Sequence, residues 1–216
     1  EFAAATGNID LLERLLNYTI NRHYPEIKNN ENKALSLLSV LMEKQIDLIV
    51  QWMRVGFIHG VMNTDNITLS GETIDYGPCA FMDHYNKATV FSSIDYGSRY
   101  AYENQPSITY WNLLRFAESI LSLISQDRKK AIKLAEKTLN NFPKIYKKSW
   151  LQMMRNKLGL LGNNKSDEHL FGSLLSWMHK KQADFTNTFK SLNKQEIPND
   201  IIFQDVDFFN WYKRWK

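Results

Sequence analysis

A long helical pattern near the start of the chain limits what this sequence can fold into. Apolar residues recur every three or four positions through residues 33–54, which predicts an amphipathic helix about 30 Å long. A helix of this length can form the centre of a domain. The 216 residues include only 9 glycines and 5 prolines, and this composition favours helices over a β-sandwich with many turns.

Helical periodicity returns along most of the chain and predicts a mainly α fold. Residues 8–23 form an expected amphipathic helix with Asn8 as its cap, and Pro25 ends the pattern. Later helices are expected over residues 111–124, 129–139, 143–158 and 167–192 and from residue 205 onward. Gly159 is expected to stop one of them.

Charge and cysteine content narrow the class of protein. The net charge of +4 arises mainly from basic runs at residues 127–130, 144–148 and 213–216. We interpret these runs as solvated helix faces and expect no nucleic-acid partner, because the nearby aromatic residues have core spacing.

A single cysteine, Cys79, excludes a disulfide-stapled scaffold. No run reaches the roughly 18 to 20 apolar residues of a membrane span, so none is expected.

The segment from Gly56 to Gly97 has a different character, with loop residues and one alternating stretch. If residues 67–69 and 73–75 are short antiparallel strands, Asn66 and Asp75 lie opposite each other at the open end of a hairpin, with Asp65 beside them. Two carboxylates and an amide oxygen are ligands of the kind that Mg²⁺ uses. The arrangement predicts a phosphate-handling site.

Each of these three residues also has a structural interpretation, which is favoured when it is taken alone. Asp65 and Asn66 could bond turn backbone, and Asp75 could cap the next element. The set together is typical of a kinase-like catalytic loop and metal-binding loop, because His59-Gly60 is followed by Asn66, a hairpin and Asp75-Tyr76-Gly77. Val61 occupies the usual position of the catalytic aspartate, which argues against ordinary phosphorylation.

The stretch Gly56 to Asn66 running into residues 73–78 closely resembles the selenoprotein O family, also called YdiU or UPF0061, of kinase-like protein adenylyltransferases. The resemblance continues through residues 81–83, 99–106, 111–113, 157–160 and 183–189. It implies a mainly α protein-kinase-like C-lobe with a small β-hairpin. Residues 1–55 would lead into the lobe as a helical pair, residues 56–106 would hold the catalytic loop, hairpin and activation-like segment, and residues 107–216 would complete the lobe.

The same resemblance implies an activity. Members of this family are described as transferring AMP from ATP to Ser, Thr or Tyr hydroxyls of proteins with Mg²⁺ or Mn²⁺. Carried over by position, Asp65 would be the catalytic base, and Asn66 and Asp75 would hold the metal. A non-catalytic helical interaction module and a kinase that transfers the γ-phosphate remain alternatives. A bacterial cytoplasm or a mitochondrion would suit the family.

Four further residues have competing interpretations. His59 could be a general base, but this histidine is usually structural in kinase-like loops. Arg99 could hold a phosphate of ATP, although a structural salt bridge is favoured. Asp184 is expected to cap or join the late helices. Cys79 is expected to be a small buried residue rather than a reactive thiol.

A nucleotide site of this class also needs a glycine-rich strand-loop, a strand lysine with its helix glutamate, and phosphate-binding arginines. Residues 1–55 contain one glycine, Gly7, and no strand pattern, so the N-lobe is expected to be absent. The start at Glu1 and the family's usual continuation beyond residues 211–215 also suggest truncation. We therefore expect the chain alone to bind ATP weakly and to transfer little AMP.

Overall fold

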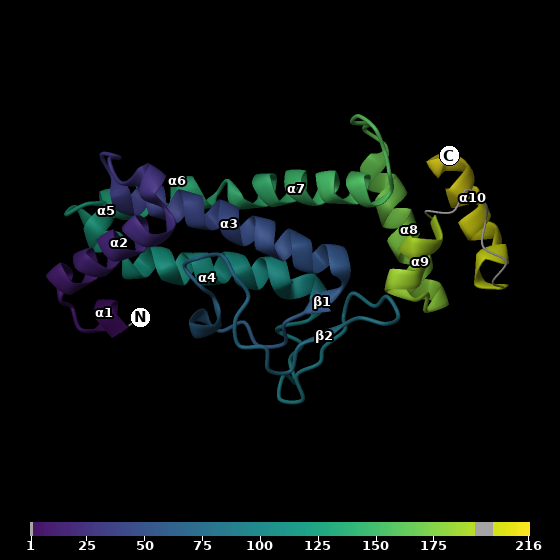
Figure 1. Ribbon diagram of the computed structural model, residues 1–216, viewed down its shortest axis with the longest axis horizontal. Helices are drawn as coiled ribbons and strands as arrows, with labels where there is room; N and C mark the ends of the chain where they lie inside the picture. Colours follow the sequence, from purple (N-terminus) through teal and green to yellow (C-terminus); the bar gives the residue numbers. More distant parts are fainter. Residues whose placement is uncertain (1, 193–200) are drawn as a thin grey trace. The chain divides into compact units, whose positions relative to one another are not determined.

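The computed structural model describes residues 2–192 and 201–216, and these are mostly helical (Figure 1). The helices are α1 (Phe2–Ala5), α2 (Ile9–His23), α3 (Lys33–Val55), α4 (Gln105–Ser119), α5 (Leu121–Ile124), α6 (Arg128–Leu139), α7 (Phe142–Lys157), α8 (Asp167–Lys181), α9 (Phe185–Leu192) and α10 (Val206–Trp215). Strands β1 (Phe57–Ile58) and β2 (Ala80–Phe81) pair antiparallel, with Phe57 opposite Phe81. A mainly α chain with a small antiparallel β element is thus confirmed.

Several helix ends follow their sequence signals. The Asn8 side chain accepts a hydrogen bond from the Leu11 N–H at 2.9 Å and caps α2 as predicted. Helix α7 ends two residues before Gly159, which adopts a φ of +67°. In the part of the chain that the structure describes, no helix combines the length and apolar character needed to cross a membrane.

The prediction of a single helix over residues 167–192 is wrong. The helical structure is interrupted between α8 and α9, where Gln182 adopts the left-handed conformation with a φ of 52°. Asp184 then begins α9, because its side chain accepts a hydrogen bond from the Asn187 N–H at 2.7 Å. The capping role predicted for Asp184 is therefore confirmed.

The chain forms two compact units, each assembled from three segments. The first unit comprises Glu1–Ile49, Met62–Tyr76 and Pro106–Tyr146. The second comprises Val50–Val61, Gly77–Gln105 and Lys147–Lys216. Neither unit is continuous in sequence, so each depends on contacts between distant segments.

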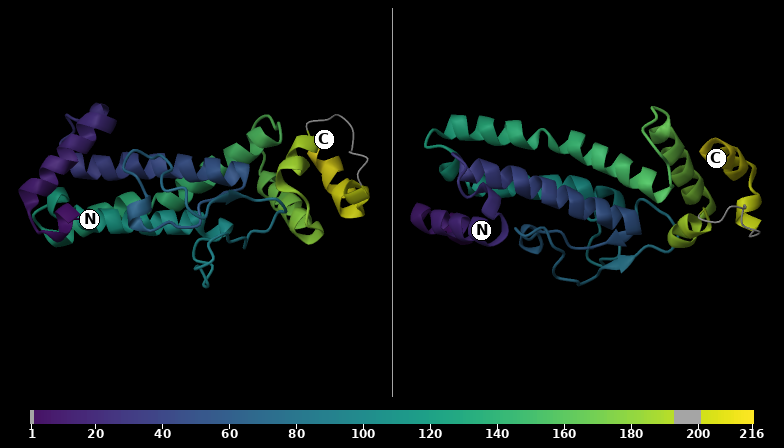
Figure 2. Two further views of the ribbon diagram at one scale, coloured as in Figure 1. Left: turned by 60° about the horizontal axis from the view of Figure 1, so that its bottom comes forward. Right: turned by 45° about the horizontal axis from the view of Figure 1, so that its top comes forward.

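The core of the first unit is the buried stripe of α3. Leu37, Leu38, Leu41, Ile46 and Ile49 are each at most 2% exposed. Helix α2 packs against α1 and α5, and α5 packs against α6 (Figure 2). Each fully buried side chain of this kind contributes about 1.5–3 kcal/mol to folding, so the stripe that the sequence displays is a main source of stability.

The core of the second unit includes the contact between α8 and α10 (Figure 2). Phe171, Leu174 and Met178 of α8 are fully buried, as are Phe208 and Trp211 of α10. The aromatic rings of Phe208 and Trp211 lie 5.7 Å apart. Large aromatic side chains bury much apolar area, which suits them to join two helices.

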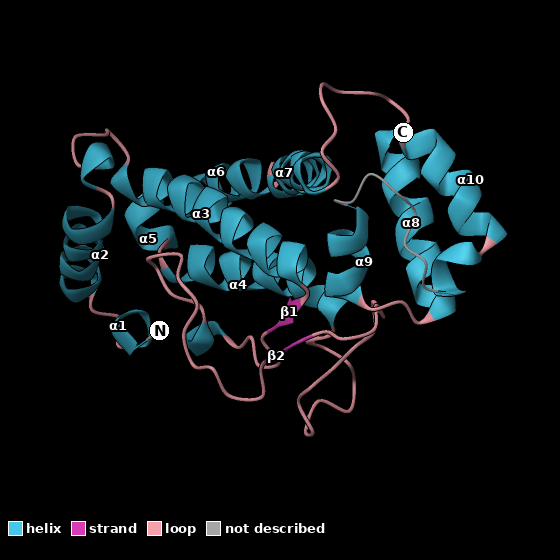
Figure 3. Ribbon diagram, turned by 45° about the vertical axis from the view of Figure 1, so that its right-hand side comes forward, coloured by secondary structure: helices cyan, strands magenta, loops and turns pink. Residues whose placement is uncertain are grey.

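Loop segments connect these helices where the sequence predicted them. Figure 3 shows that most of the chain between α3 and α4 has no regular structure, apart from β1, β2 and two short 3₁₀ turns at Thr64–Asn66 and Tyr102–Asn104. The expected strands at residues 67–69 and 73–75 reduce to one antiparallel bridge between Ile67 and Thr73. The basic residues of the runs at 127–130, 144–148 and 213–216 are exposed, as predicted for solvated helix faces.

Candidate functional site

A short buried turn, residues 56–61, precedes the predicted catalytic loop and is called the neck below. The Gln105 side chain joins its parts: Oε1 accepts the His59 N–H at 3.1 Å, and Nε2 donates to the Phe57 carbonyl at 3.0 Å. Gln105 and His59 are both fully buried. Gly60 has a φ of +84°, and a Cβ there would lie 3.0 Å from the Pro78 carbonyl oxygen. Only glycine fits this turn without strain.

The geometry of His59 supports its structural interpretation. Its ring stacks on Trp52 with centroids 5.3 Å apart, and the Val61 N–H donates to Nδ1 at 3.4 Å. A fully buried ring with packed faces holds the neck and is poorly placed to exchange protons with a substrate.

Residues 62–76, called the acidic loop below, carry the three predicted site residues. The loop starts at the buried Met62, whose carbonyl accepts a hydrogen bond from Asn112 Nδ2 at 3.0 Å. A single 3₁₀ turn, Thr64–Asn66, follows. Asp65 lies on this turn and is exposed. Its carboxylate has no hydrogen-bond or ion-pair partner among residues 2–192 and 201–216.

The middle of the acidic loop is anchored on α3 and on the residue after α2. Gln45 Nε2 donates to the Thr68 carbonyl at 2.7 Å, and the Tyr24 hydroxyl donates to the Leu69 carbonyl at 2.5 Å. Burial, with a smaller contribution from the negative charge of Glu26, raises the pKa of Tyr24 to about 12, so the hydroxyl remains a donor over the physiological range. The turn is further held by Thr68, whose Oγ1 donates to the Glu72 carbonyl at 2.8 Å and accepts the Glu72 N–H at 2.9 Å.

The structure brings Asn66 and Asp75 together, as predicted. Asn66 Nδ2 donates to Asp75 Oδ2 at 3.0 Å. Asp75 has a φ of 54°, a conformation that costs a non-glycine residue roughly 1–3 kcal/mol and that clusters at functional sites. Asp65 is the neighbour of Asn66 in the chain, but its carboxylate is bonded to neither member of the pair. The site is thus an amide–carboxylate pair with a separate exposed carboxylate beside it.

The amide–carboxylate pair fits a magnesium-type ion. Within the described residues, no three His, Cys, Asp or Glu side chains cluster closely enough to hold a metal. Mg²⁺ needs no such cage, because it commonly uses one or two protein ligands and completes its shell with waters and phosphate oxygens. A half-turn of the Asn66 amide would exchange Nδ2 for Oδ1 and give the ion two oxygen ligands.

Two other candidates lie in the second unit. Arg99 is exposed, its N–H donates to Asp95 Oδ1 at 2.9 Å, and its guanidinium lies 5.8 Å from the centre of the Tyr100 ring. The Cys79 thiol is free and half-buried. The surroundings of Arg99 and of Cys79 do not point to a contact with a ligand.

The sequence analysis assigned no role to the residues that anchor the neck and the acidic loop. Gln45 is fully buried in the apolar stripe of α3, between Leu41 and Ile49, and Gln105 is fully buried at the start of α4. A polar residue at an apolar-face position is the signal that could have identified Gln45, because a buried amide requires hydrogen-bond partners. No comparable local signal marks Gln105.

Protein kinases hold Mg²⁺ through an asparagine of the catalytic loop and an aspartate of a following loop, and these are the residue types that Asn66 and Asp75 bring together here. The family model for "Protein adenylyltransferase SelO" matches residues 1–211. The chain therefore belongs to the SelO family.

Curated relatives agree with this assignment. Proteins named "Protein nucleotidyltransferase YdiU" from Pelagibacter ubique, Alcanivorax borkumensis and Bacillus cereus are 57%, 52% and 51% identical to the chain, over 215, 216 and 216 residues. Each alignment covers 100% of this chain and 44%, 45% and 44% of the relative. The chain thus spans less than half the length of these relatives.

Proposed function

We propose that this chain carries the catalytic loop of a protein adenylyltransferase, which transfers AMP from ATP to Ser, Thr or Tyr hydroxyls of proteins. The observation that carries the proposal is the Asn66–Asp75 pair at 3.0 Å, with Asp75 in a strained conformation, in a member of the SelO family. The backbone conformation of Asp75 supports a functional role for the pair, because non-glycine residues in this region of φ cluster at functional sites.

Asp65 is the proposed catalytic base. Its carboxylate is exposed and lacks a protein partner within the described residues, so it can accept the proton of an incoming hydroxyl. The hydroxyl oxygen bonds to the α-phosphorus, the bond from that phosphorus to the bridging oxygen breaks, and pyrophosphate leaves. Asp65 holds the released proton.

Asn66 and Asp75 are the proposed ligands of Mg²⁺ or Mn²⁺. Such an ion would offset the negative charge of the ATP phosphates. The chain's own contribution is to hold the two proposed ligands in place, through Gln45 and Tyr24 at the middle of the acidic loop and Asn112 at its start. For Arg99, a phosphate contact stays the less favoured alternative to a structural salt bridge.

Val61 separates this proposal from protein or small-molecule phosphorylation. A valine cannot accept a hydroxyl proton, and Val61 lies where a kinase-like loop would present its aspartate. The relatives are more than twice as long as this chain, so the activity is proposed for the whole protein. The 216 residues alone are expected to bind ATP weakly and to transfer little AMP, because much of the positioning would come from other segments.

The test is a chimera in which this chain replaces the matching 215 residues of the Pelagibacter ubique relative. Incubation with protein substrates and Mg²⁺ or Mn²⁺ compares ATP labelled at the α-phosphate with ATP labelled at the γ-phosphate. Label from the α-position only supports adenylyl transfer. Asp65→Asn and Asp75→Ala should each lower this labelling at least 100-fold, as expected when a base or a metal ligand is lost.

A matched control is Asp47→Ala, because Asp47 is an exposed aspartate of α3 outside the site. It should label as the unaltered chimera does. Label from the γ-position only would overturn the proposal in favour of a kinase. Absence of both labels, while the unaltered relative labels its substrates, would favour an interaction module without catalysis.

A further inference from the structure

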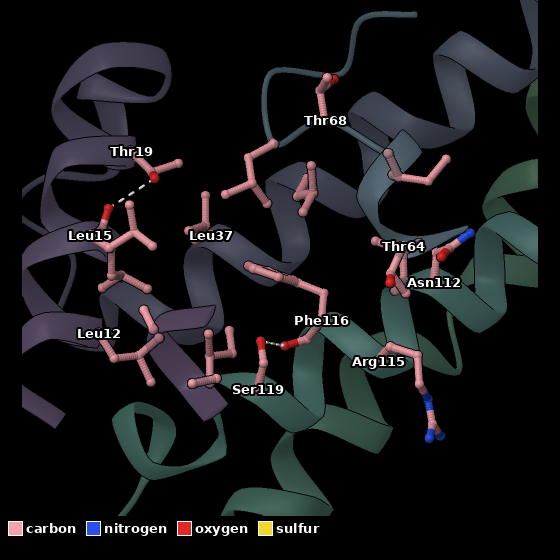
Figure 4. A pocket seen from close by; sticks show the side chains of 18 residues that line it. Leu12, Leu15, Thr19, Leu37, Thr64, Thr68, Asn112, Arg115, Phe116 and Ser119 are labelled. Atoms are coloured by element: carbon pink, nitrogen blue, oxygen red, sulfur yellow. Dashed lines mark hydrogen bonds between the residues drawn. The ribbon is translucent and has the colours of Figure 1, made fainter. Parts of the chain in front are cut away.

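A cavity of about 190 Å³ lies in the first unit, below the acidic loop (Figure 4). Its walls come from α1, α2, α3 and α4, from Ile120 after α4, and from Thr64 and residues 67–69 of the acidic loop. Apolar side chains predominate, among them Leu12, Leu15, Leu37 and Phe116. An engineered apolar cavity of about 150 Å³ binds benzene, so this one has room for a small organic molecule.

Asn112 supplies a buried acceptor at one end of the cavity. The residue is 4% exposed, and its Nδ2 donates to the carbonyls of Met62 and Ile108, each at 3.0 Å. Its Oδ1 has no hydrogen-bond partner in the described part of the chain and almost no accessible surface, so a donor in the cavity reaches it only after the amide shifts slightly. In Figure 4 the amide lies beside Thr64, with its oxygen toward the pocket and its nitrogen turned away. A buried acceptor without a partner is costly, and a bound donor would remove that cost.

The charge of the walls selects against an ionic ligand. Arg115 is the single charged residue among those that line the cavity. Its side chain is 44% exposed and pairs with Glu118 at 2.7 Å, and Figure 4 shows its guanidinium directed away from the pocket. A carboxylate or ammonium group would therefore enter an apolar space with no opposite charge to meet it.

We propose that this cavity binds a small, neutral, apolar molecule that carries one hydrogen-bond donor, with the donor on Asn112 Oδ1. Thr64 and residues 67–69 line the cavity and flank Asp65 and Asn66, so the ligand also orders the acidic loop. The cavity is lined by none of Asp65, Asn66 and Asp75, so ligand binding there goes beyond the proposed function.

The experiment uses the 216-residue chain and two probes of the same shape, indole and indene. Indole has an N–H donor and indene has none. Titrations followed by NMR should show saturable binding of indole, about tenfold tighter than that of indene, since a satisfied buried acceptor contributes roughly 1–2 kcal/mol. Equal affinities would overturn the role of Asn112. No saturable binding of either probe would overturn the site.

Two further measurements locate the probe. Ser119→Phe places a ring in the cavity and should weaken indole binding at least tenfold, whereas Ser122→Phe, on an exposed position of α5, should leave it unchanged. Nuclear Overhauser contacts from indole to the methyl groups of Leu15 and Leu37 give the location even if Ser119→Phe fails to fold. Contacts elsewhere, or unchanged affinity in a folded Ser119→Phe, would overturn the proposal.

Hydrogen exchange tests the coupling to the acidic loop. Saturating indole should slow exchange of the amides of residues 62–69 about tenfold, because a ligand can slow opening only by binding the closed state more tightly. Peptides from α8, in the other unit, should not change. Slowing that is equal in both places, or absent from residues 62–69, would contradict loop ordering.

Discussion

The neck and the acidic loop are neighbours in sequence but differ in how their polar groups are satisfied. In the neck, His59 is fully buried and its N–H and ring are both engaged. In the acidic loop, the backbone is anchored by Tyr24 and Gln45 while the carboxylates of Asp65 and Asp75 stay exposed. The carboxylates proposed to act on a charged substrate thus stay accessible on a backbone that buried side chains hold in place.

The amide side chains that hold the two segments show the same contrast. Gln105 uses both its oxygen and its nitrogen in the neck. Gln45 and Asn112, which hold the acidic loop, each keep a buried oxygen without a partner among the described residues. Each such oxygen lowers stability by roughly 1–3 kcal/mol. The neck is therefore expected to be the more stable segment, and the acidic loop the one that ligands can stabilise further.

The largest expected effect on stability comes from removal of the Gln105 side-chain amide, which joins the parts of the neck. Gln105→Leu leaves the His59 N–H and the Phe57 carbonyl without their side-chain partner, and should lower the free energy of unfolding by about 3 kcal/mol. Urea denaturation measures the change. Gln152→Leu is the control, because Gln152 is exposed on α7, and should cost less than about 0.5 kcal/mol. Similar losses in the two variants would show that the neck is not specially constrained.

Gly60→Ala tests the neck's turn. The substitution forces a Cβ onto a φ of +84° and to within 3.0 Å of the Pro78 carbonyl oxygen, which should cost about 2 kcal/mol in urea denaturation. Gly97→Ala is a matched control, since a Cβ there meets nothing within 4 Å. Stability unchanged by Gly60→Ala would mean that the turn can relax.

Lys157 gives the neck region a dependence on pH. Its Nζ donates to the Arg54 carbonyl, just before Gly56, and lies 4.1 Å and 3.7 Å from the ring centres of Phe185 and Phe189. Burial, helped by the charge of Arg54, lowers the pKa of Lys157 from 10.5 to about 7. Above pH 7 the unfolded chain binds more protons than the folded chain, so stability rises with pH until about 10.5.

The rise between pH 7 and 9 should be about 1 kcal/mol, below the full value for such a shift, because the group is partly exposed and the rings favour its charged form. Lys157→Met should abolish the rise in denaturation curves taken at several pH values. Lys148→Met, an exposed lysine of the same helix, should retain it. The same slope in the wild type and in Lys157→Met would remove Lys157 as its source.

The sequence predicted the acidic loop better than the neck, for a physical reason. The approach of Asn66 to Asp75 is set by a local turn, whose spacing is visible in the sequence. The neck depends on Gln105, which lies 46 positions beyond His59, and no periodicity predicts such a pairing. The break at Gln182 was missed because glutamine, unlike glycine, gives no signal for a left-handed residue.

The smallest expected effect has the opposite sign and addresses the acidic loop. Asp75→Gly relieves a φ of 54° and removes the exposed hydrogen bond from Asn66; the relief of strain should exceed the loss of that bond, for a net rise in the free energy of unfolding of about 0.5 kcal/mol. The same change should weaken Mn²⁺ binding, followed by electron paramagnetic resonance, at least tenfold, since one of two proposed ligands is lost.

Ser98→Gly distinguishes the effect of backbone strain on stability from the effect of losing a metal ligand, because Ser98 has nearly the same φ, 53°, but lies outside the acidic loop. It should gain a similar stability and leave Mn²⁺ binding unchanged. If Asp75→Gly instead destabilises the chain and keeps its Mn²⁺ affinity, the strained aspartate serves the turn and not a metal. The opposite pattern, stability gained and metal lost, is the signature of strain retained for function.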